Sequence, residues 1–292
     1  MTYGIDSGCT LGVVGESGCG KSMTALALMG LVPAPGRVGG EVRFAGRDLL
    51  GQPARDWRRL RGDGIAMISQ EPGTALNPVM RVGRQVAEPL VLHRHLSWRQ
   101  AERDAVELLD QVGIPSPQER ARAYPHEMSG GQRQRACIAM ALACRPKLLI
   151  ADEPTTALDV TIQAGILELL QTLQDETGAA IQFISHNLAV VAEVAHEIIV
   201  MYAGRIVEQA PADALFANPL HPYTQGLLAT LPDPDHRVDR LPTIPGAVSD
   251  LPARGCSFAP RCPRGDASCT AAEPPLEAHR PGHLAACYKV DA

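Results

Sequence analysis

Eight consecutive residues near the start of the chain have the composition and spacing of a loop that binds a phosphate chain. They read Gly15-Glu16-Ser17-Gly18-Cys19-Gly20-Lys21-Ser22 and fit the pattern G-x-x-x-x-G-K-[ST]. Glycines let the backbone wrap closely around an anion and turn its N–H groups inward. Lys21 is expected to reach the β- and γ-phosphates, and the Ser22 hydroxyl to bind Mg²⁺. The loop therefore predicts a bound nucleoside triphosphate with its magnesium ion.

A pair of adjacent carboxylates closes an apolar segment later in the chain. Residues 148–151 read Leu-Leu-Ile-Ala and are followed by Asp152 and Glu153. A buried strand of this kind would deliver Asp152 to the metal side of a phosphate site, where it can hold Mg²⁺ through water. Glu153 comes next and can polarise the water that attacks the phosphate.

Two further polar residues follow apolar segments that are predicted to be strands. Gln70 ends the segment 64–69, and its amide could touch both Mg²⁺ and the attacking water. His186 follows the predicted strand 180–184, at a position that would reach the γ-phosphate. A histidine at a strand end is more often structural, so only the other site residues favour a catalytic role for His186.

A second glycine motif precedes a helical pattern. It reads Ser129-Gly130-Gly131-Gln132. A helix that begins near Gln132 would point the amides of Gly130 and Gly131, with the Ser129 hydroxyl, at an anion.

Short strand-like segments alternate with helical patterns along most of the chain. The predicted strands cover residues 10–14, 41–44, 64–69, 147–151, 180–184, 197–202 and 205–209. Alternation of this kind predicts an α/β fold with a mainly parallel sheet. Residues 79–92 and 97–112 have helical spacing, with Ser97 as a predicted N-cap, and the whole stretch from about 79 to 145 is expected to be a helical insertion. Prolines become frequent after Pro211, so a domain boundary is expected near residue 210, with 211–292 as an extension.

The bulk composition restricts the classes of function. The chain has 292 residues, 45% hydrophobic residues and a formal net charge of −5, so no global basic field indicates nucleic acid. No segment has the length and apolarity of a membrane span or the pattern of a signal peptide. We expect a cytosolic protein that reaches a membrane only by docking to a partner.

Taken together, these motifs resemble the ATP-binding subunits of ABC transporters. The matching features are the Walker A loop 15–22, the Q-loop Gln70, the signature Met128–Gln132, the Walker B end Asp152-Glu153, the D-loop Ala157-Leu158-Asp159 and the switch His186. The resemblance implies a P-loop NTPase fold and ATP hydrolysis with Mg²⁺. It also implies that Ser129, Gly130, Gly131 and Gln132 act on ATP held by a second ATPase subunit.

A narrower resemblance is to the oligopeptide/dipeptide (and nickel) importer branch. It rests on Gln70-Glu71-Pro72, Leu76-Asn77-Pro78, His221-Pro222-Tyr223-Thr224 and the segment Gly255–Cys262. It implies a peripheral subunit on the cytoplasmic face of the membrane, bound to permease subunits and to a paralogous ATPase, and served indirectly by an extracytoplasmic solute-binding protein. Two alternatives are a soluble ABC ATPase acting on DNA or ribosomes, and an importer subunit for nickel or another small solute.

One departure from the family concerns the start of the chain. Family members carry β-strands and an adenine-stacking aromatic residue upstream of the Walker A loop, whereas here the loop begins at Gly15. Tyr3 is too close to the loop to take that role. We expect either that the chain start is truncated or misassigned, with N-terminal β-strands missing, or that this subunit binds nucleotide weakly. The chain as given is expected to bind ATP less tightly than one extended upstream.

Four cysteines gather near the C-terminus. Cys256, Cys262, Cys269 and Cys287 lack the paired C-x-x-C spacing of a zinc ribbon. Four thiolates could still fold a proline-rich segment around a metal. Similar tails in the importer branch are associated with a [4Fe–4S] cluster, to which Cys₄ ligation is suited. Zinc and free thiols are the alternatives.

Overall fold

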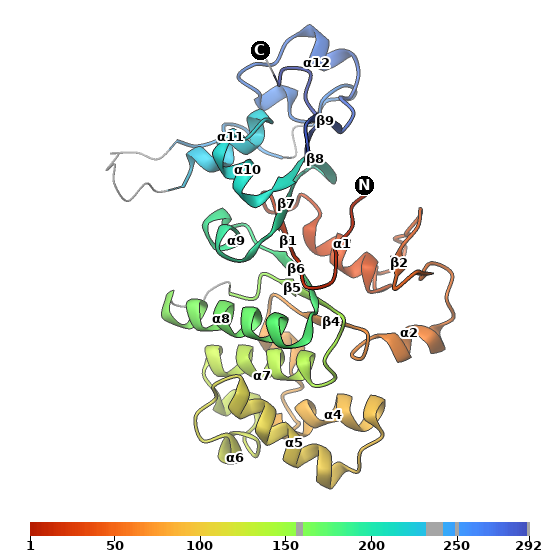
Figure 1. Cartoon of the computed structure of the whole chain (residues 1–292), viewed down its shortest axis with the longest axis vertical. Helices are drawn as coiled ribbons and strands as arrows, with labels where there is room; N and C mark the ends of the chain where they lie inside the picture. Colours follow the sequence, from red (N-terminus) through yellow and green to blue (C-terminus); the bar gives the residue numbers. More distant parts are fainter. Residues whose placement is uncertain (156–159, 232–241, 249–250, 291–292) are drawn as a thin grey trace. The chain divides into compact units, whose positions relative to one another are not determined.

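The computed structural model describes residues 1–155, 160–231, 242–248 and 251–290 (Figure 1). The chain forms two compact units. The first comprises residues 1–5, 9–22 and 183–292, and the second comprises residues 6–8 and 23–182. Helix α1 (Lys21–Leu28) and strand β6 (Ala180–Ile184) each contribute residues to both units.

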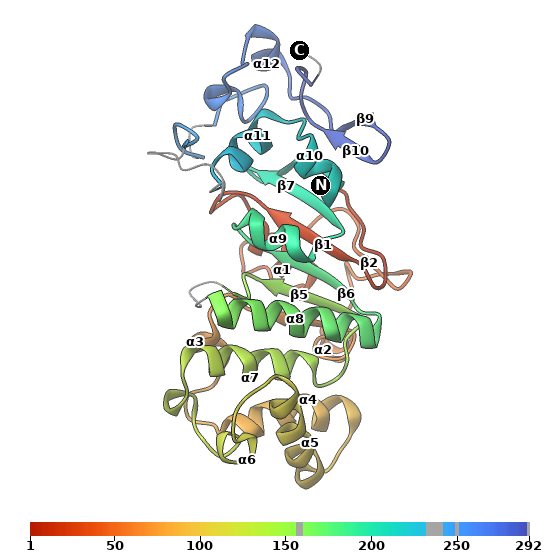
Figure 2. The same cartoon turned by 60° about the vertical axis from the view of Figure 1, so that its left-hand side comes forward.

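The first unit is built on strands that pair in the order β1, β7, β8, β10, β9 (Figure 2). The pairing of β1 with β7 is parallel, and the pairings of β7 with β8, β8 with β10 and β10 with β9 are antiparallel. The strands are β1 (Thr10–Val14), β7 (Glu197–Tyr202), β8 (Arg205–Pro211), β9 (Glu277–Arg280) and β10 (His283–Ala285). Its helices are α9 (Leu188–Val194), α10 (Ala212–Ala217), α11 (Pro222–Ala229), the short η2 (Ala259–Arg261) and α12 (Ala267–Ala271).

Strand β1 leads directly into the phosphate loop and fixes the position at which the loop begins. All five of its residues are buried, as expected for a strand of a parallel sheet that is covered on both faces. Helix α9 packs on β1, and a Cβ at Gly12 would collide with the Val191 side chain. The strand ends at Val14, and Gly15 turns the chain into the loop.

A buried carboxylate joins β8 to the C-terminal extension. Glu208 has no exposed surface. Its two oxygens accept hydrogen bonds from the N–H groups of Leu220 (2.7 Å) and His221 (2.9 Å), and His283 Nε2 lies 2.7 Å from its Oε1 atom. A buried charge needs such partners, because it has lost its contact with water.

The second unit combines a strand pair with a bundle of helices. Strands β4 (Ile65–Ile68) and β5 (Leu148–Asp152) pair in parallel, and β2 (Arg43–Phe44) pairs antiparallel with β3 (Arg47–Asp48). The longer helices are α4 (Val82–Arg94), α5 (Trp98–Gln111), α7 (Gly130–Leu142) and α8 (Val160–Thr177). The shorter helices are α2 (Ala54–Leu60), α3 (Pro72–Ala75), α6 (Pro117–Arg120) and η1 (Pro125–Glu127). Helices α4, α5 and α7 pack on one another, and α8 lies alongside α7 in both views (Figures 1 and 2).

The predicted α/β class is confirmed, and some helix ends are shifted by a few residues from their predicted positions. The Ser97 hydroxyl caps α5 by accepting a hydrogen bond from the Gln100 N–H, as expected. Helix α4 begins three residues later than predicted, at Val82. The residues before it form a turn in which the Gln85 side chain bonds to the backbone of Asn77 and Met80.

Candidate functional site

The phosphate loop lies in the first unit, between β1 and α1, which is the context that its motif requires. Gly15 has a φ of +152°, and a Cβ there would collide with the Met201 carbonyl oxygen, so only glycine fits. Lys21 is 5% exposed. Its Nζ atom donates to the carbonyl oxygens of Gly15 (2.7 Å) and Glu16 (3.2 Å). The ammonium group is thus held inside the loop by the loop's own backbone.

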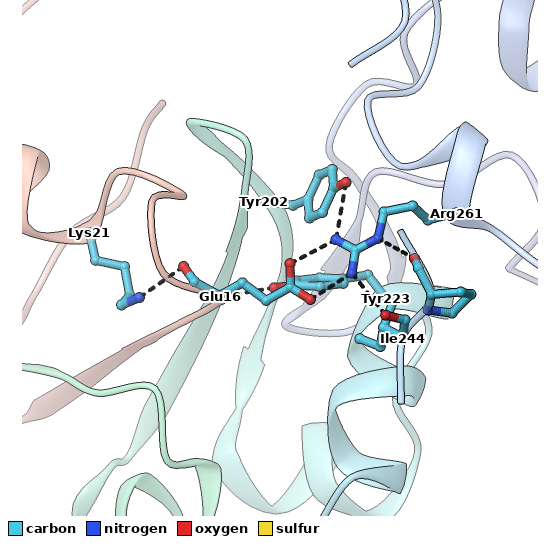
Figure 3. Close-up of polar contacts among 7 residues, drawn as sticks. Glu16, Lys21, Tyr202, Tyr223, Ile244 and Arg261 are labelled. Carbon is cyan, nitrogen blue, oxygen red and sulfur yellow. Dashed lines mark hydrogen bonds and ion pairs between the residues drawn. The ribbon is translucent and has the colours of Figure 1, made fainter. Parts of the chain in front are cut away.

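Two residues of the C-terminal extension contact this loop, and sequence reasoning did not identify them as site residues. The Tyr223 hydroxyl accepts a hydrogen bond of 2.8 Å from the Glu16 N–H. The Arg261 guanidinium donates two hydrogen bonds to the Glu16 carboxylate, at 2.7 and 2.9 Å (Figure 3). These hydrogen bonds raise the pKa of Arg261 above its ordinary value, so the guanidinium stays charged.

The paired carboxylates lie in the second unit, at the carboxyl end of β5. Asp152 is the last residue of this strand and is 4% exposed. Glu153 follows it with a φ of 49°, a left-handed conformation that turns the chain as the strand ends. The Gln70 side chain donates a hydrogen bond of 3.0 Å from Nε2 to Glu153 Oε2. The structure therefore brings together two residues that the sequence predicted to share a site.

The signature segment forms the N-terminus of α7, in the second unit. Ser129 is the N-cap: its hydroxyl accepts from the Gln132 N–H at 3.3 Å, and Gln132 Oε1 accepts from the Ser129 N–H at 3.1 Å. The helix begins at Gly130, two residues earlier than predicted. Gly130 is exposed, with open space where a Cβ would be. The arrangement presents a helix N-terminus to solvent, a type of site that favours anions.

The remaining predicted site residues are placed as follows. Ser22 is exposed in the first turn of α1, and His186 is exposed just after β6. Both belong to the first unit, whereas Gln70, Asp152 and Glu153 belong to the second. Asp159, together with the other D-loop residues Ala157 and Leu158, lies outside the described residues.

The four C-terminal cysteines line one small pocket. The pocket is lined by Cys256, Cys262, Cys269 and Cys287, together with residues that include His221, Phe258 and Pro274. All four are unpaired thiols, and burial raises the pKa of Cys256, Cys262 and Cys287. Among the described residues, however, no group of three or more His, Cys, Asp or Glu side chains is arranged to hold a metal ion. The structure therefore does not support the predicted iron–sulfur or zinc site.

Family models match most of the chain. Residues 1–156 match the model described as "ABC transporter", and residues 207–269 match the C-terminal region of oligopeptide/dipeptide transporters. In the parts of the chain that the structure describes, no helix is long and apolar enough to cross a membrane.

The chain is similar over its whole length to oligopeptide transport ATP-binding proteins. It is 50% identical to OppD of Escherichia coli over 99% of this chain and 86% of OppD. It is 51% identical to OppD of Salmonella typhimurium over 99% of this chain and 87% of that protein. The solved dimer of the ATP-binding cassette MJ0796, in a post-hydrolysis state with ADP and Pi, aligns with a TM-score of 0.65 at 27% identity, over 72% of this chain and 88% of that chain. The chain therefore belongs to the ABC transporter family, in its oligopeptide/dipeptide branch, and is an ATPase of that family.

Proposed function

We propose that the protein is the ATP-hydrolysing subunit that energises the import of oligopeptides or dipeptides. The observation that carries this proposal is that the region matching oligopeptide/dipeptide transporters bonds directly to the nucleotide loop, through Tyr223 and Arg261. The full-length relatives, which are named for oligopeptide transport, favour this function over a soluble ABC ATPase acting on DNA or ribosomes. They also favour peptides over nickel as the cargo.

Each site residue has a role that its chemistry allows. Lys21 and the amides of the Walker A loop would bind the phosphates of ATP, while Ser22, Asp152 and Gln70 would be ligands for Mg²⁺. Glu153 is the general base, because a carboxylate beside the attacking water can accept its proton. His186 would reach the γ-phosphate, and Asp159 of the D-loop would take part in binding the nucleotide.

The signature segment acts on a nucleotide held by a second ATPase subunit. The N-terminus of α7 supports this role, because Ser129 and Gly130 are exposed there and a helix N-terminus favours anions. We propose that this partner is a paralogous chain and that both bind permease subunits on the cytoplasmic face of the membrane. A solute-binding protein on the other side would deliver the peptide.

Deletion of the gene tests the cargo, and affinity purification tests the assembly. A strain lacking this protein is expected to lose uptake of labelled tri- and tetrapeptides, with uptake restored by the wild-type gene and not by one that encodes Glu153→Gln. The tagged protein, extracted from membranes in mild detergent, is expected to bring down integral permease subunits and a second ABC ATPase. Unchanged peptide uptake with lost nickel uptake would contradict the cargo. Recovery without any membrane protein would contradict the transport function itself.

For the cysteine pocket we propose a [4Fe–4S] cluster as a structural cofactor. The support is that the four thiols line one pocket and that Cys₄ ligation suits such a cluster. A single zinc ion needs all its sulfurs at about 2.3 Å from one point, whereas a cluster has ligands that surround a larger body. When bound, the cluster would tie the extension together through cysteines that lie far apart in the sequence. Zinc is the alternative.

Anaerobic purification tests the cluster. We expect a brown protein with broad absorption near about 400 nm and roughly four iron atoms per chain. Cys262→Ser should lose most of the iron, because Cys262 lines the pocket. Cys9→Ser is the matched control, since Cys9 lies at the other end of the chain and does not line this pocket. A colourless protein that contains no iron would rule the cluster out, and one zinc per chain would favour the alternative.

A further inference from the structure

Glu16 is the point at which the nucleotide loop and the C-terminal extension meet. Three parts of this one residue make three different contacts (Figure 3). Its N–H donates to the Tyr223 hydroxyl, its carbonyl oxygen accepts from Lys21 Nζ at 3.2 Å, and its carboxylate binds Arg261. A shift of Glu16 would therefore move one of the carbonyl oxygens that accept a hydrogen bond from Lys21 Nζ.

Arg261 is buried and fully occupied by acceptors. Its side chain is 4% exposed. Apart from the two bonds to Glu16, its Nε atom donates to the Pro245 carbonyl oxygen at 2.7 Å, and its Nη atoms donate to the Tyr202 hydroxyl at 3.4 Å and the Ile244 carbonyl oxygen at 3.3 Å. The other hydrogen bonds fix the orientation of the planar guanidinium. Its two parallel hydrogen bonds to Glu16 in turn restrict the orientation of the Glu16 carboxylate.

Tyr223 fixes the backbone of Glu16 from the other side. It is fully buried and packs edge-on against Tyr202, with ring centroids 4.8 Å apart, and against Phe258 at 5.3 Å. Burial raises the pKa of its phenol, so the hydroxyl stays neutral and can accept the Glu16 N–H. At the start of the same helix, burial lowers the pKa of His221 to about 4, which leaves its Nδ1 atom neutral and able to accept from the Tyr223 N–H.

We propose that Arg261 is a positioning residue for nucleotide binding, which acts through Glu16 to hold the Walker A loop and Lys21 in the conformation that binds phosphate. The proposal rests on the assignment of residues 15–22 as the nucleotide loop. The proposal gives the C-terminal extension a role in the ATPase reaction. Arg261 lies 245 residues after Glu16 in the chain and would help to fix the conformation of the Walker A loop. Arg261 directly precedes Cys262 of the thiol pocket, so the same short segment contributes both to that pocket and to the loop.

The competing interpretation is that the ion pair only anchors the extension to the rest of its unit. The two interpretations differ in what a second substitution does. A residue that acts through Glu16 has no further effect on nucleotide affinity once the Glu16 carboxylate is gone, whereas an anchoring residue affects stability in either background.

The test is a set of nucleotide titrations on the full-length chain, using a non-hydrolysable ATP analogue with Mg²⁺. We expect Arg261→Ala to weaken binding about tenfold and Glu16→Ala to weaken it by a similar factor, with the double variant no weaker than the weaker single variant. Arg261→Lys keeps the charge but loses the paired hydrogen bonds, and it should fall between Arg261→Ala and wild type. Arg254→Ala is the matched control, because Arg254 is exposed on the same extension. The melting temperature without nucleotide is recorded for every variant.

Each outcome is decisive. Affinity that stays within twofold of wild type in Arg261→Ala, with a lowered melting temperature, would overturn the proposal and leave a purely anchoring ion pair. The proposal would also be overturned if Arg261→Ala weakened nucleotide binding tenfold further in the Glu16→Ala background, because Arg261 would then not act through Glu16. Lys21→Ala, measured alongside, separates this failure from a failure of the assigned loop. If Lys21→Ala binds the analogue normally, the loop assignment itself is wrong.

Discussion

Replacement of Glu153 by glutamine is expected to lower the rate of ATP hydrolysis by about two to four orders of magnitude while ATP binding is retained. The amide has nearly the shape of the carboxylate but cannot accept a proton from the attacking water. In the structure, Glu153 Oε2 already accepts a hydrogen bond from Gln70, which holds the carboxylate at the end of β5. Steady-state phosphate release, measured together with nucleotide binding, separates the two effects.

The control for this variant is Glu193→Gln, since Glu193 is exposed on α9 and loses the same charge. Its turnover should match that of wild type. We also expect Glu153→Gln to accumulate an ATP-bound dimer, because closure requires binding and reopening requires hydrolysis. Turnover near the wild-type rate in Glu153→Gln would show that another group activates the water.

The second large effect is expected for Lys21→Ala, which should weaken ATP binding by about a hundredfold and reduce hydrolysis accordingly. Lys21 is buried, and its expected role is to bind the β- and γ-phosphates of ATP. Loss of a buried charge-assisted contact costs roughly 2–5 kcal/mol, and each 1.4 kcal/mol corresponds to about a tenfold change in affinity.

Lys147→Ala is the matched control, because Lys147 is exposed just before β5. Nucleotide titration and a thermal melt are measured on both variants. A Lys21→Ala protein that melts like wild type and binds ATP with unchanged affinity would contradict the assigned phosphate site. One that melts at a much lower temperature would need comparison with Lys21→Met, which keeps the packing of the side-chain stem.

The local parts of the site could be predicted from sequence because each depends on residues that are close together in the chain. The phosphate loop needs a strand before it and a helix after it, and both are visible as an apolar segment and a helical pattern. Ser129 caps α7 through Gln132, three residues away, and Asp152 ends a strand whose four preceding residues are apolar. In each case the signal and its structural consequence lie within one element.

The rest depends on contacts that leave no local signal. Arg261 and Glu16 are 245 residues apart, and neither sequence neighbourhood indicates the other. Strands β9 and β10 were not predicted in the extension. All four residues of β9 are exposed, so β9 shows no alternation of buried and exposed positions, and β10 has only three residues. Both are strands because β8 offers its edge to β10, which is a property of the tertiary structure.

The hydrogen bonds of the buried Glu208 carboxylate limit where the chain can be truncated. Its three hydrogen-bonding partners, Leu220, His221 and His283, all come after β8. If the chain were cut near residue 210, β8 would keep this side chain and lose these three hydrogen bonds. Strand β8 would also lose its pairing with β10, so the shortened chain is expected to be less stable. Strand β8 and the extension therefore belong to one compact unit, and a shortened version of this subunit is expected to need both.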